Sequence, residues 1–252
     1  MITDAAVQDG LVNGQFFLEY LPTVSLVDGR CLGAEALARW RRPSGVVQPD
    51  TFIPLIEGTY LSGMLTYWVF ETVASELGDW LRVHQHASIG VNVPPEILGR
   101  GGLQYLATKP GVSEIRNQII LEVTERGVPD NMGLAVLETA SRSGVRVALD
   151  DVTLSATNLV ILSRATVDLI KTDASLAAQI TPDCPCPAWL SGLSALLQST
   201  PVSIIAEGVE TEAQATALRS AGVTMAQGYH FSRPISAEQF KAYYARSNEP
   251  SG

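Results

Sequence analysis

The sequence predicts an α/β fold, a modified TIM-type (β/α)8 barrel with an antiparallel first strand. Three observations support this prediction. Two extended segments joined by a very short turn open the chain, helical and extended patterns then alternate, and nearly every extended segment ends on a polar residue. A doubly wound open sheet is the alternative fold, because it shows the same alternation.

The first two predicted strands cover Phe16 to Leu26 and Cys31 to Trp40. Only Val27-Asp28-Gly29 and one further residue lie between them. A connection this short can join only antiparallel neighbours. The first strand is therefore expected to oppose the rest of the barrel.

The remaining chain alternates between period-3.6 and extended patterns, so its strands are expected to be parallel. The predicted strands are Ile89 to Val93, Ile119 to Val123, Val145 to Asp151, Val167 to Lys171, Val202 to Ala206 and Thr224 to Ala226. The predicted helices are Leu61 to Leu81, Pro95 to Ala107, Asp130 to Ser143, Ala156 to Arg164, Trp189 to Leu197, Thr211 to Ala221 and Ser236 to Tyr244. Proline opens one of these helices and glycine ends two of them, as is typical of helix boundaries.

Length and composition favour one large domain. The chain has 252 residues, of which 46% are hydrophobic, enough for one barrel-sized core. We expect the barrel over residues 11–246, with tails over 1–10 and 247–252. No apolar run approaches the ~20 residues of a membrane span, and the first residues lack the pattern of a signal peptide. These features predict a cytoplasmic domain, and the start close to a strand suggests a piece of a larger sensor protein.

The charge and the cysteines exclude other classes of function. The net charge is −9 and no basic run occurs, so duplex nucleic acid is not an expected partner. A small phosphate ligand would need local cations. Cys31 reads as a core residue, and Cys184-Pro185-Cys186 lacks the spacing of a zinc site. We interpret that segment as a surface loop in a reducing compartment.

Polar residues end almost every predicted strand, as Asp150 and Asp151 end the strand from Val145. Alone, each could be a salt bridge, a turn former or a helix cap. Because the carboxyl ends of barrel strands meet at one rim, we expect these residues to converge there. In strand order they are Glu35, Asn92, Glu122 with Glu125, Asp150 with Asp151, Lys171, Glu207 with Glu210, and Gln227.

Such a cluster of carboxylates requires a compensating cation, since like charges at short range raise each other's pKa. Carboxylate oxygens with one Asn amide suit Mg²⁺ or Mn²⁺ better than zinc. There are more carboxylates than one octahedral ion can use. Two ions sharing one carboxylate could clamp a phosphodiester for in-line attack by an activated water.

The segment Glu35-Ala36-Leu37-Ala38-Arg39-Trp40 resembles the signature of the EAL-domain family, bacterial phosphodiesterases that linearise cyclic di-GMP. Other motifs of that family follow in the same order over almost the whole chain. They are Phe52-Ile53-Pro54, Asn92, Glu122-Val123-Thr124-Glu125, Asp150-Asp151, Lys171-Thr172-Asp173, Ala206 to Thr211, Gln227-Gly228-Tyr229 and Ser232-Arg233-Pro234.

The resemblance implies cleavage of one phosphodiester of cyclic di-GMP to give pGpG, with two Mg²⁺ or Mn²⁺ ions. It assigns one ion to Glu35, Asn92, Glu122 and Asp150, and the second to Asp150, Asp151 and Glu207. No protein nucleophile is needed, which agrees with the lack of a Ser-His or Cys-His set. A homodimer is also compatible with the resemblance.

The resemblance further implies roles in catalysis and substrate binding. Lys171 would orient the attacking water and act with Glu207 and Glu35. The predicted dinucleotide contacts are Leu37, Arg39, through phosphate, and Gln227. Glu125 and Glu210 are expected to support the rim.

The loop after Asp151 departs from the family pattern. Val152 to Leu159 reads V-T-L-S-A-T-N-L, without the two glycines that the family places there. If those positions need positive φ, Thr153 and Ser155 strain the loop by roughly 1 to 2 kcal/mol each. Leu21 and Pro94 replace the usual Gln and Ser. These departures leave open a second hypothesis, a weak or inactive domain that acts as a cyclic di-GMP receptor or protein-interaction module. An unrelated metal-dependent barrel lyase or aldolase is a third.

Overall fold

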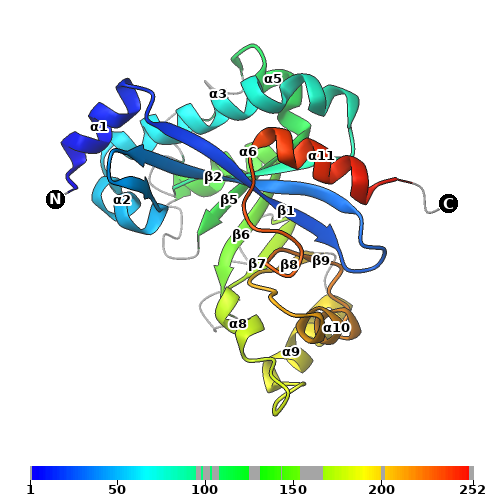
Figure 1. Ribbon diagram of the computed structural model, residues 1–252. Helices are drawn as coiled ribbons and strands as arrows, with labels where there is room; N and C mark the ends of the chain where they lie inside the picture. Colours follow the sequence, from blue (N-terminus) through cyan, green and yellow to red (C-terminus); the bar gives the residue numbers. More distant parts are fainter. Residues whose placement is uncertain are drawn as a thin grey trace.

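A computed structural model describes residues 2–94, 98, 103, 108–124, 131–142, 144–153, 167–199 and 202–249. In this part of the chain eight strands close into a barrel and a ninth lies at its edge (Figure 1). The barrel strands are β1 (Phe16–Ser25), β2 (Cys31–Arg42), β4 (Ser88–Asn92), β5 (Ile119–Thr124), β6 (Arg146–Val152), β7 (Leu169–Thr172), β8 (Ser203–Ala206) and β9 (Met225–Ala226).

Strand pairing decides between the two predicted folds. The order is β1-β9-β8-β7-β6-β5-β4-β2, and β1 also pairs with β2, so the sheet closes on itself. β1 is antiparallel to both β2 and β9, while the pairs from β2 through β4 to β9 are parallel. The predicted barrel with an antiparallel first strand is confirmed, and the open sheet is excluded. A short strand that was not predicted, β3 (Gly45–Val47), extends the edge of β2.

Helices form where the sequence predicts them at five described places. These are α3 (Tyr60–Val83), α6 (Asn131–Arg142), α9 (Ala188–Ser199), α10 (Glu212–Ser220) and α11 (Ala237–Ser247). α10 and α11 each begin with a capping box, formed by Thr211 with Gln214 and by Ser236 with Gln239. The predicted helices Pro95 to Ala107 and Ala156 to Arg164 lie almost wholly outside the described residues.

Several short helices were not predicted. They are α1 (Asp4–Val12), α2 (Pro49–Ile56), α5 (Val112–Ile115), η2 (Arg116–Gln118) and α8 (Ala174–Ala178). The expected tail over residues 1–10 is wrong, because Thr3 caps α1 and Val7 is fully buried against Phe16 and Trp40. A nine-residue helix with two buried positions has too weak a periodic pattern to be found without its tertiary contacts.

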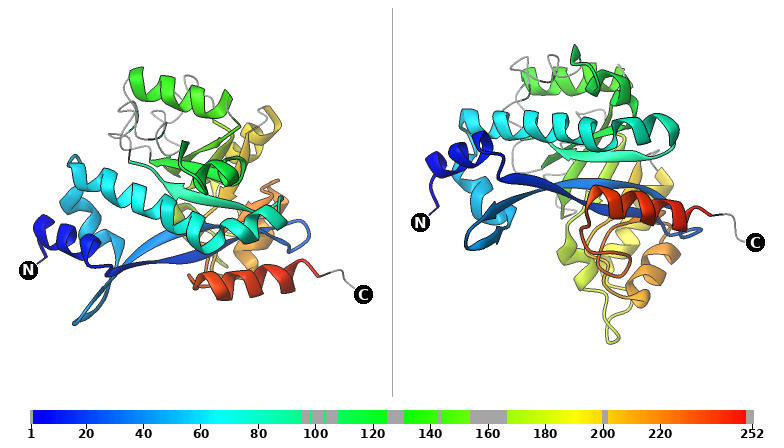
Figure 2. Two further views of the ribbon diagram at one scale, coloured as in Figure 1. Left: turned by 90° about the horizontal axis from the view of Figure 1, so that it is seen from above. Right: turned by 45° about the horizontal axis from the view of Figure 1, so that its top comes forward.

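The core divides between two sides of the barrel. Helices α3 and α11 lie along β1 and β2, as both views in Figure 2 show, and bury an apolar cluster that includes Tyr20, Leu77 and Phe240. A second cluster packs α9 and α10 against β7 and β8, around Ile170, Leu193 and Leu218. The barrel is therefore held from both sides, which fixes the strand ends that carry the polar residues.

Candidate active site

A buried lysine lies at the centre of the polar residues. Lys171, at the end of β7, has 0% of its surface exposed. Its Nζ lies 2.7 Å from Glu207 Oε1, 2.9 Å from Glu35 Oε2 and Glu122 Oε2, and 3.3 Å from Asp150 Oδ1. One ammonium group thus contacts carboxylates that come from β2, β5 and β6 and from the residue directly after β8.

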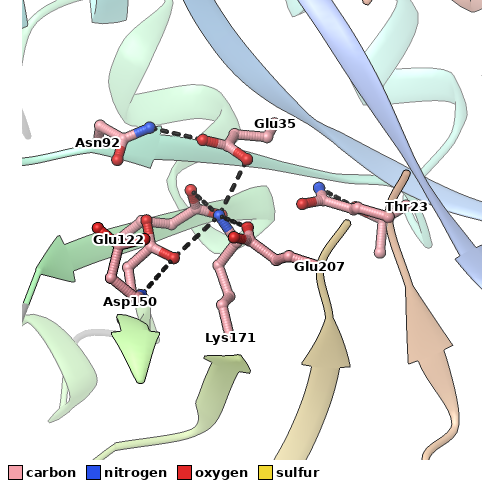
Figure 3. A network of polar contacts seen from close by, with 9 residues as sticks. Thr23, Glu35, Asn92, Glu122, Asp150, Lys171 and Glu207 are labelled. Atoms are coloured by element: carbon pink, nitrogen blue, oxygen red, sulfur yellow. Dashed lines mark hydrogen bonds and ion pairs between the residues drawn. The ribbon is translucent and has the colours of Figure 1, made fainter. Parts of the chain in front are cut away.

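Figure 3 shows these side chains converging from separate strands. Asn92, at the end of β4, donates from Nδ2 to Glu35 Oε1 at 2.7 Å. Glu122 lies on β5 directly beside Asn92 in the strand register. The predicted convergence is therefore present for Glu35, Asn92, Glu122, Asp150, Lys171 and Glu207.

The charges of the cluster do not balance. Four carboxylates surround one ammonium group, and all five side chains are largely removed from water. Burial disfavours the charged form of Lys171, but Asp150, Glu122, Glu207 and Glu35 together raise its pKa well above the usual range. Lys171 therefore stays protonated.

The carboxylates respond to burial in different ways. Burial raises the pKa of Glu207 to about 8, raises that of Asp150, and, with repulsion from Glu35, raises that of Glu122 well above its usual value. Burial also acts against ionisation of Glu35, but Lys171 and the hydrogen bond from Asn92 lower its pKa. The cluster therefore holds surplus protons that a cation could displace.

Two groups of three carboxylates can each offer ligand atoms within 4.8 Å of one another. One comprises Glu35, Glu122 and Asp150, and the other Asp150, Asp151 and Glu207. Asp150 belongs to both. The donors are oxygens, as Mg²⁺ and Mn²⁺ prefer. The residues therefore fit two hard divalent ions that share one carboxylate.

Asp151 reaches this site through an unusual backbone conformation. Its φ is 58°, the only positive value for a residue other than glycine in the described chain. In a regular strand Asp150 and Asp151 would point to opposite faces. The left-handed conformation and the irregular register between Leu149 and Val152 let both carboxylates serve the second group. Aspartate tolerates this conformation better than most residues do.

Two glycines hold the rim beyond β8 and β9 close to its neighbours. Gly208 has φ of 66°, and an added Cβ would lie 2.5 Å from Ala174 Cβ. At Gly228, with φ of 152°, an added Cβ would lie 2.1 Å from the carbonyl oxygen of Val209. Side chains at either position would displace the backbone that carries Glu207 or Gln227.

Two of the three predicted substrate contacts, Leu37 and Arg39, occupy the face of β2 that also bears Glu35, and the third, Gln227, directly follows β9. Leu37 and Arg39 follow Glu35 at alternate positions, and Leu37 is half-buried. Arg39 is only 7% exposed, and its Nε donates to Glu19 Oε2 at 2.8 Å. Glu19 was not among the predicted site residues, although alternation along the first strand puts residues 17, 19 and 21 on one face.

Of the two residues expected to support the rim, Glu210 and Glu125, only Glu210 is described. Glu210 is exposed, and among the described residues no hydrogen bond or ion pair joins its carboxylate to the cluster. Glu125 lies outside the described residues, as do residues 154–159 of the divergent loop. Of that loop, Val152 is fully buried and Thr153 exposed. Leu21 lies opposite Glu35 in the strand register, and its side chain has no polar atom to offer a ligand there.

The raised pKa of Glu207 gives a pH prediction for the metal-free protein. The pKa of Glu207 is about 8 in the folded protein and 4.5 for an ordinary glutamate, so the folded state binds the proton more tightly than the unfolded state does. Binding this proton stabilises the folded state. The stabilisation is complete below about pH 4.5 and is lost as the pH rises through 8. In EDTA, we expect the free energy of unfolding, measured by denaturant titration, to fall between pH 6 and pH 8.5.

Glu207→Gln should flatten that pH dependence, whereas Glu212→Gln, at a carboxylate that is 70% exposed, should leave it unchanged. Since a divalent ion must displace the proton, Mn²⁺ affinity should rise over the same range, by at most about tenfold per pH unit for one proton. A wild-type stability that increases toward pH 8.5 would contradict the assignment.

Comparison with known families places the whole described barrel in one family. The family model described as "EAL domain" matches residues 4–234. The chain belongs to the EAL domain family. The sequence resemblance is thereby confirmed, and the acidic cluster lies within the matched region.

Curated relatives of this EAL domain include proteins of Escherichia coli and Pseudomonas aeruginosa. It is 33% identical over 245 residues to the probable cyclic di-GMP phosphodiesterase PdeB of Escherichia coli, covering 93% of this chain and 45% of that protein. It is 32% identical over 253 residues to the bifunctional diguanylate cyclase/cyclic di-GMP phosphodiesterase MucR of Pseudomonas aeruginosa. This match covers 95% of this chain and 36% of that protein. The chain spans less than half the length of these relatives.

Solved structures agree with the barrel. The phosphodiesterase domain of MucR in complex with c-di-GMP superposes with a TM-score of 0.82 at 31% identity, covering 94% of this chain and 98% of that one. The EAL enzyme Bd1971 in its cAMP-bound form superposes with a TM-score of 0.86 at 26% identity, and the match covers 95% of this chain and 69% of that one.

Within the described residues, no helix has both the length and the apolar character needed to cross a bilayer.

Proposed function

We propose that this EAL domain hydrolyses cyclic di-GMP to the linear dinucleotide pGpG, using two Mg²⁺ or Mn²⁺ ions. The observation that carries the proposal is the pair of three-carboxylate groups that share Asp150 around Lys171. Relatives named cyclic di-GMP phosphodiesterases match over most of this chain, which supports the choice of substrate.

In this proposal Glu35, Glu122 and Asp150, with Asn92, hold one ion, and Asp150, Asp151 and Glu207 hold the other. Divalent ions bound there supply Lewis acidity, which stabilises charge on phosphoryl oxygens and lowers the pKa of a coordinated water. Asn92 fixes the Glu35 carboxylate through its 2.7 Å hydrogen bond. Glu207, whose pKa burial raises to about 8, would have to lose its proton to hold an ion.

Lys171 retains its proton, so it acts as a hydrogen-bond donor and a fixed positive charge beside the reacting phosphate. It orients the attacking water, and its charge opposes that of the surrounding acids. Arg39, along the same face of β2 as Glu35, would contact a substrate phosphate. Glu19 Oε2 accepts from its Nε and the Ala38 carbonyl oxygen from its Nη1, and the other N–H groups of the guanidinium would serve the phosphate.

The direct test is incubation of the purified protein with cyclic di-GMP and Mn²⁺ or Mg²⁺, followed by chromatography. We expect pGpG to accumulate with added metal and not in EDTA. Tight binding of intact cyclic di-GMP without product would favour the receptor alternative, for which the described residues provide no specific support. Neither binding nor product would contradict both functions.

Three further proposals concern the setting of the domain. We infer a cytoplasmic location, where a dinucleotide second messenger would be available. We also infer that the domain works within a longer sensor protein, because it matches only part of its relatives. A homodimer is compatible with the family, and light scattering at micromolar concentration tests it.

A further inference from the structure

A buried amide next to the acidic cluster has an acceptor without a donor. Gln227 is 1% exposed, and its Nε2 donates to Thr23 Oγ1 at 2.8 Å. Its Oε1 is buried and has no hydrogen-bond partner among the described residues. A buried acceptor left without a partner is costly, and native proteins usually satisfy such groups. This one therefore points to a donor that a ligand brings.

The strand register places this amide beside the second group of carboxylates. Gln227 continues β9: its backbone N–H donates to Ala206, the residue before Glu207. On the other side, β9 pairs with β1, where Val24 lies opposite Ala226, so Thr23 lies next to Gln227. Figure 3 shows Thr23 on the Glu207 side of the cluster, away from Asn92.

Thr23 holds one end of the amide. Because its hydroxyl oxygen accepts from one N–H of Nε2, Oε1 lies at the other end of the amide and has no partner among the described residues. Thr23 is 8% exposed, so water does not readily replace it as the partner. An ionised carboxylate cannot donate to Oε1, whereas the hydration water of a divalent ion can, and an ion bound there would keep the neighbouring carboxylates ionised.

We propose that Thr23 is a positioning residue: it orients the Gln227 amide so that Oε1 accepts a hydrogen bond from water on a divalent ion held by Asp150, Asp151 and Glu207. The inference rests on the proposed function for the identity of the ion. It adds a contact from β1, a strand that contributes none of the carboxylates. Partners of this kind outside the ligand set affect metal affinity or activity by about 10- to 100-fold.

The test compares Thr23→Val, which keeps the shape but removes the hydroxyl, with Thr23→Ser, which restores it. Mn²⁺ binding is measured by electron paramagnetic resonance without nucleotide, and kcat and KM for cyclic di-GMP are measured separately. For Thr23→Val we expect about tenfold weaker Mn²⁺ binding at the weaker site and a lower kcat, with KM within about twofold. Thr23→Ser should lie within about twofold of the wild type.

A double-variant cycle separates orientation from a general structural effect. In a Gln227→Leu background, Thr23→Val should add no more than about a twofold change, because the amide it orients is gone. Independent, multiplying effects of the two variants, or wild-type Mn²⁺ binding by Thr23→Val, would overturn the proposal. A melting temperature of Thr23→Val close to that of Thr23→Ser shows that both variants are folded.

The Mn²⁺ measurement also distinguishes this proposal from the proposed function. If the wild type binds Mn²⁺ but forms no pGpG, the hydrolytic function fails, while the role of Thr23 is still decided by the binding data. If the wild type binds no Mn²⁺, both the two-ion site and the role of Thr23 are overturned.

Discussion

Asp150→Asn is expected to lower the rate of cyclic di-GMP hydrolysis by at least about 10³-fold. Asp150 is the carboxylate shared by the two groups, so its replacement by a neutral amide weakens both ion sites. Metal ions contribute several kcal/mol to such reactions, and ~4 kcal/mol corresponds to about 10³-fold in rate. The measurement is pGpG formation under saturating Mn²⁺, with Mn²⁺ stoichiometry determined in parallel.

The same variant should be at least as stable as the wild type when metal is removed. Burial raises the pKa of Asp150, which shows that its charge is unfavourable in the folded metal-free protein. The Asn side chain retains an oxygen for the hydrogen bond from Asp151 N. Asp183→Asn, in an exposed turn, is the matched control and should change neither property. Near-normal turnover by Asp150→Asn would remove the shared-ligand assignment.

Lys171→Met is the second variant expected to have a large effect, and it should lower both the stability of the protein and the rate of hydrolysis. Removal of the ammonium leaves Glu35, Glu122, Asp150 and Glu207 without their buried cation. Breaking buried charge pairs in this way costs about 3 to 5 kcal/mol. In EDTA at pH 8 we expect the unfolding free energy to fall by about that amount, and saturating Mn²⁺ to restore part of it.

Hydrolysis by Lys171→Met should fall by about 10²- to 10³-fold even with Mn²⁺ present, because a preorganised donor has been lost. Lys109→Met provides the control: Lys109 Nζ lies 3.0 Å from Glu71 on the surface, where a salt bridge contributes about 0 to 1 kcal/mol. If both lysine variants lost equal stability in EDTA, the central role of Lys171 would be wrong. Lys171→Arg retains the charge and tests whether the geometry of the ammonium also matters.

The sequence could predict the barrel because its evidence is local and repeated. Alternating apolar strands, capped helices and the short turn at Val27 to Gly29 each restrict the neighbouring topology. The polar residues at the strand ends could be predicted for the same reason, since parallel strands place their carboxyl ends at one rim. Even the two ligand groups, which share Asp150, follow from this order once the family resemblance is added.

The sequence alone could not predict features that depend on distant residues. Helix α1 is recognisable only through its burial against Phe16 and Trp40, and the contact of Thr23 with Gln227 joins residues 204 apart. The positive φ of Asp151 likewise could not be predicted from the sequence, because it occurs where the pairing of β6 with β7 shifts register.

The amino-acid sequence by itself determined the strand order, the acidic residues and the family of this protein. The tertiary structure decided how closely the acids approach one another, that Lys171 contacts four of them, and that one buried amide oxygen has no partner among the described residues. The physical reason is that charge and hydrogen bonding depend on distances of about 3 Å between side chains, whereas sequence periodicity determines only the face and the strand end at which each side chain lies.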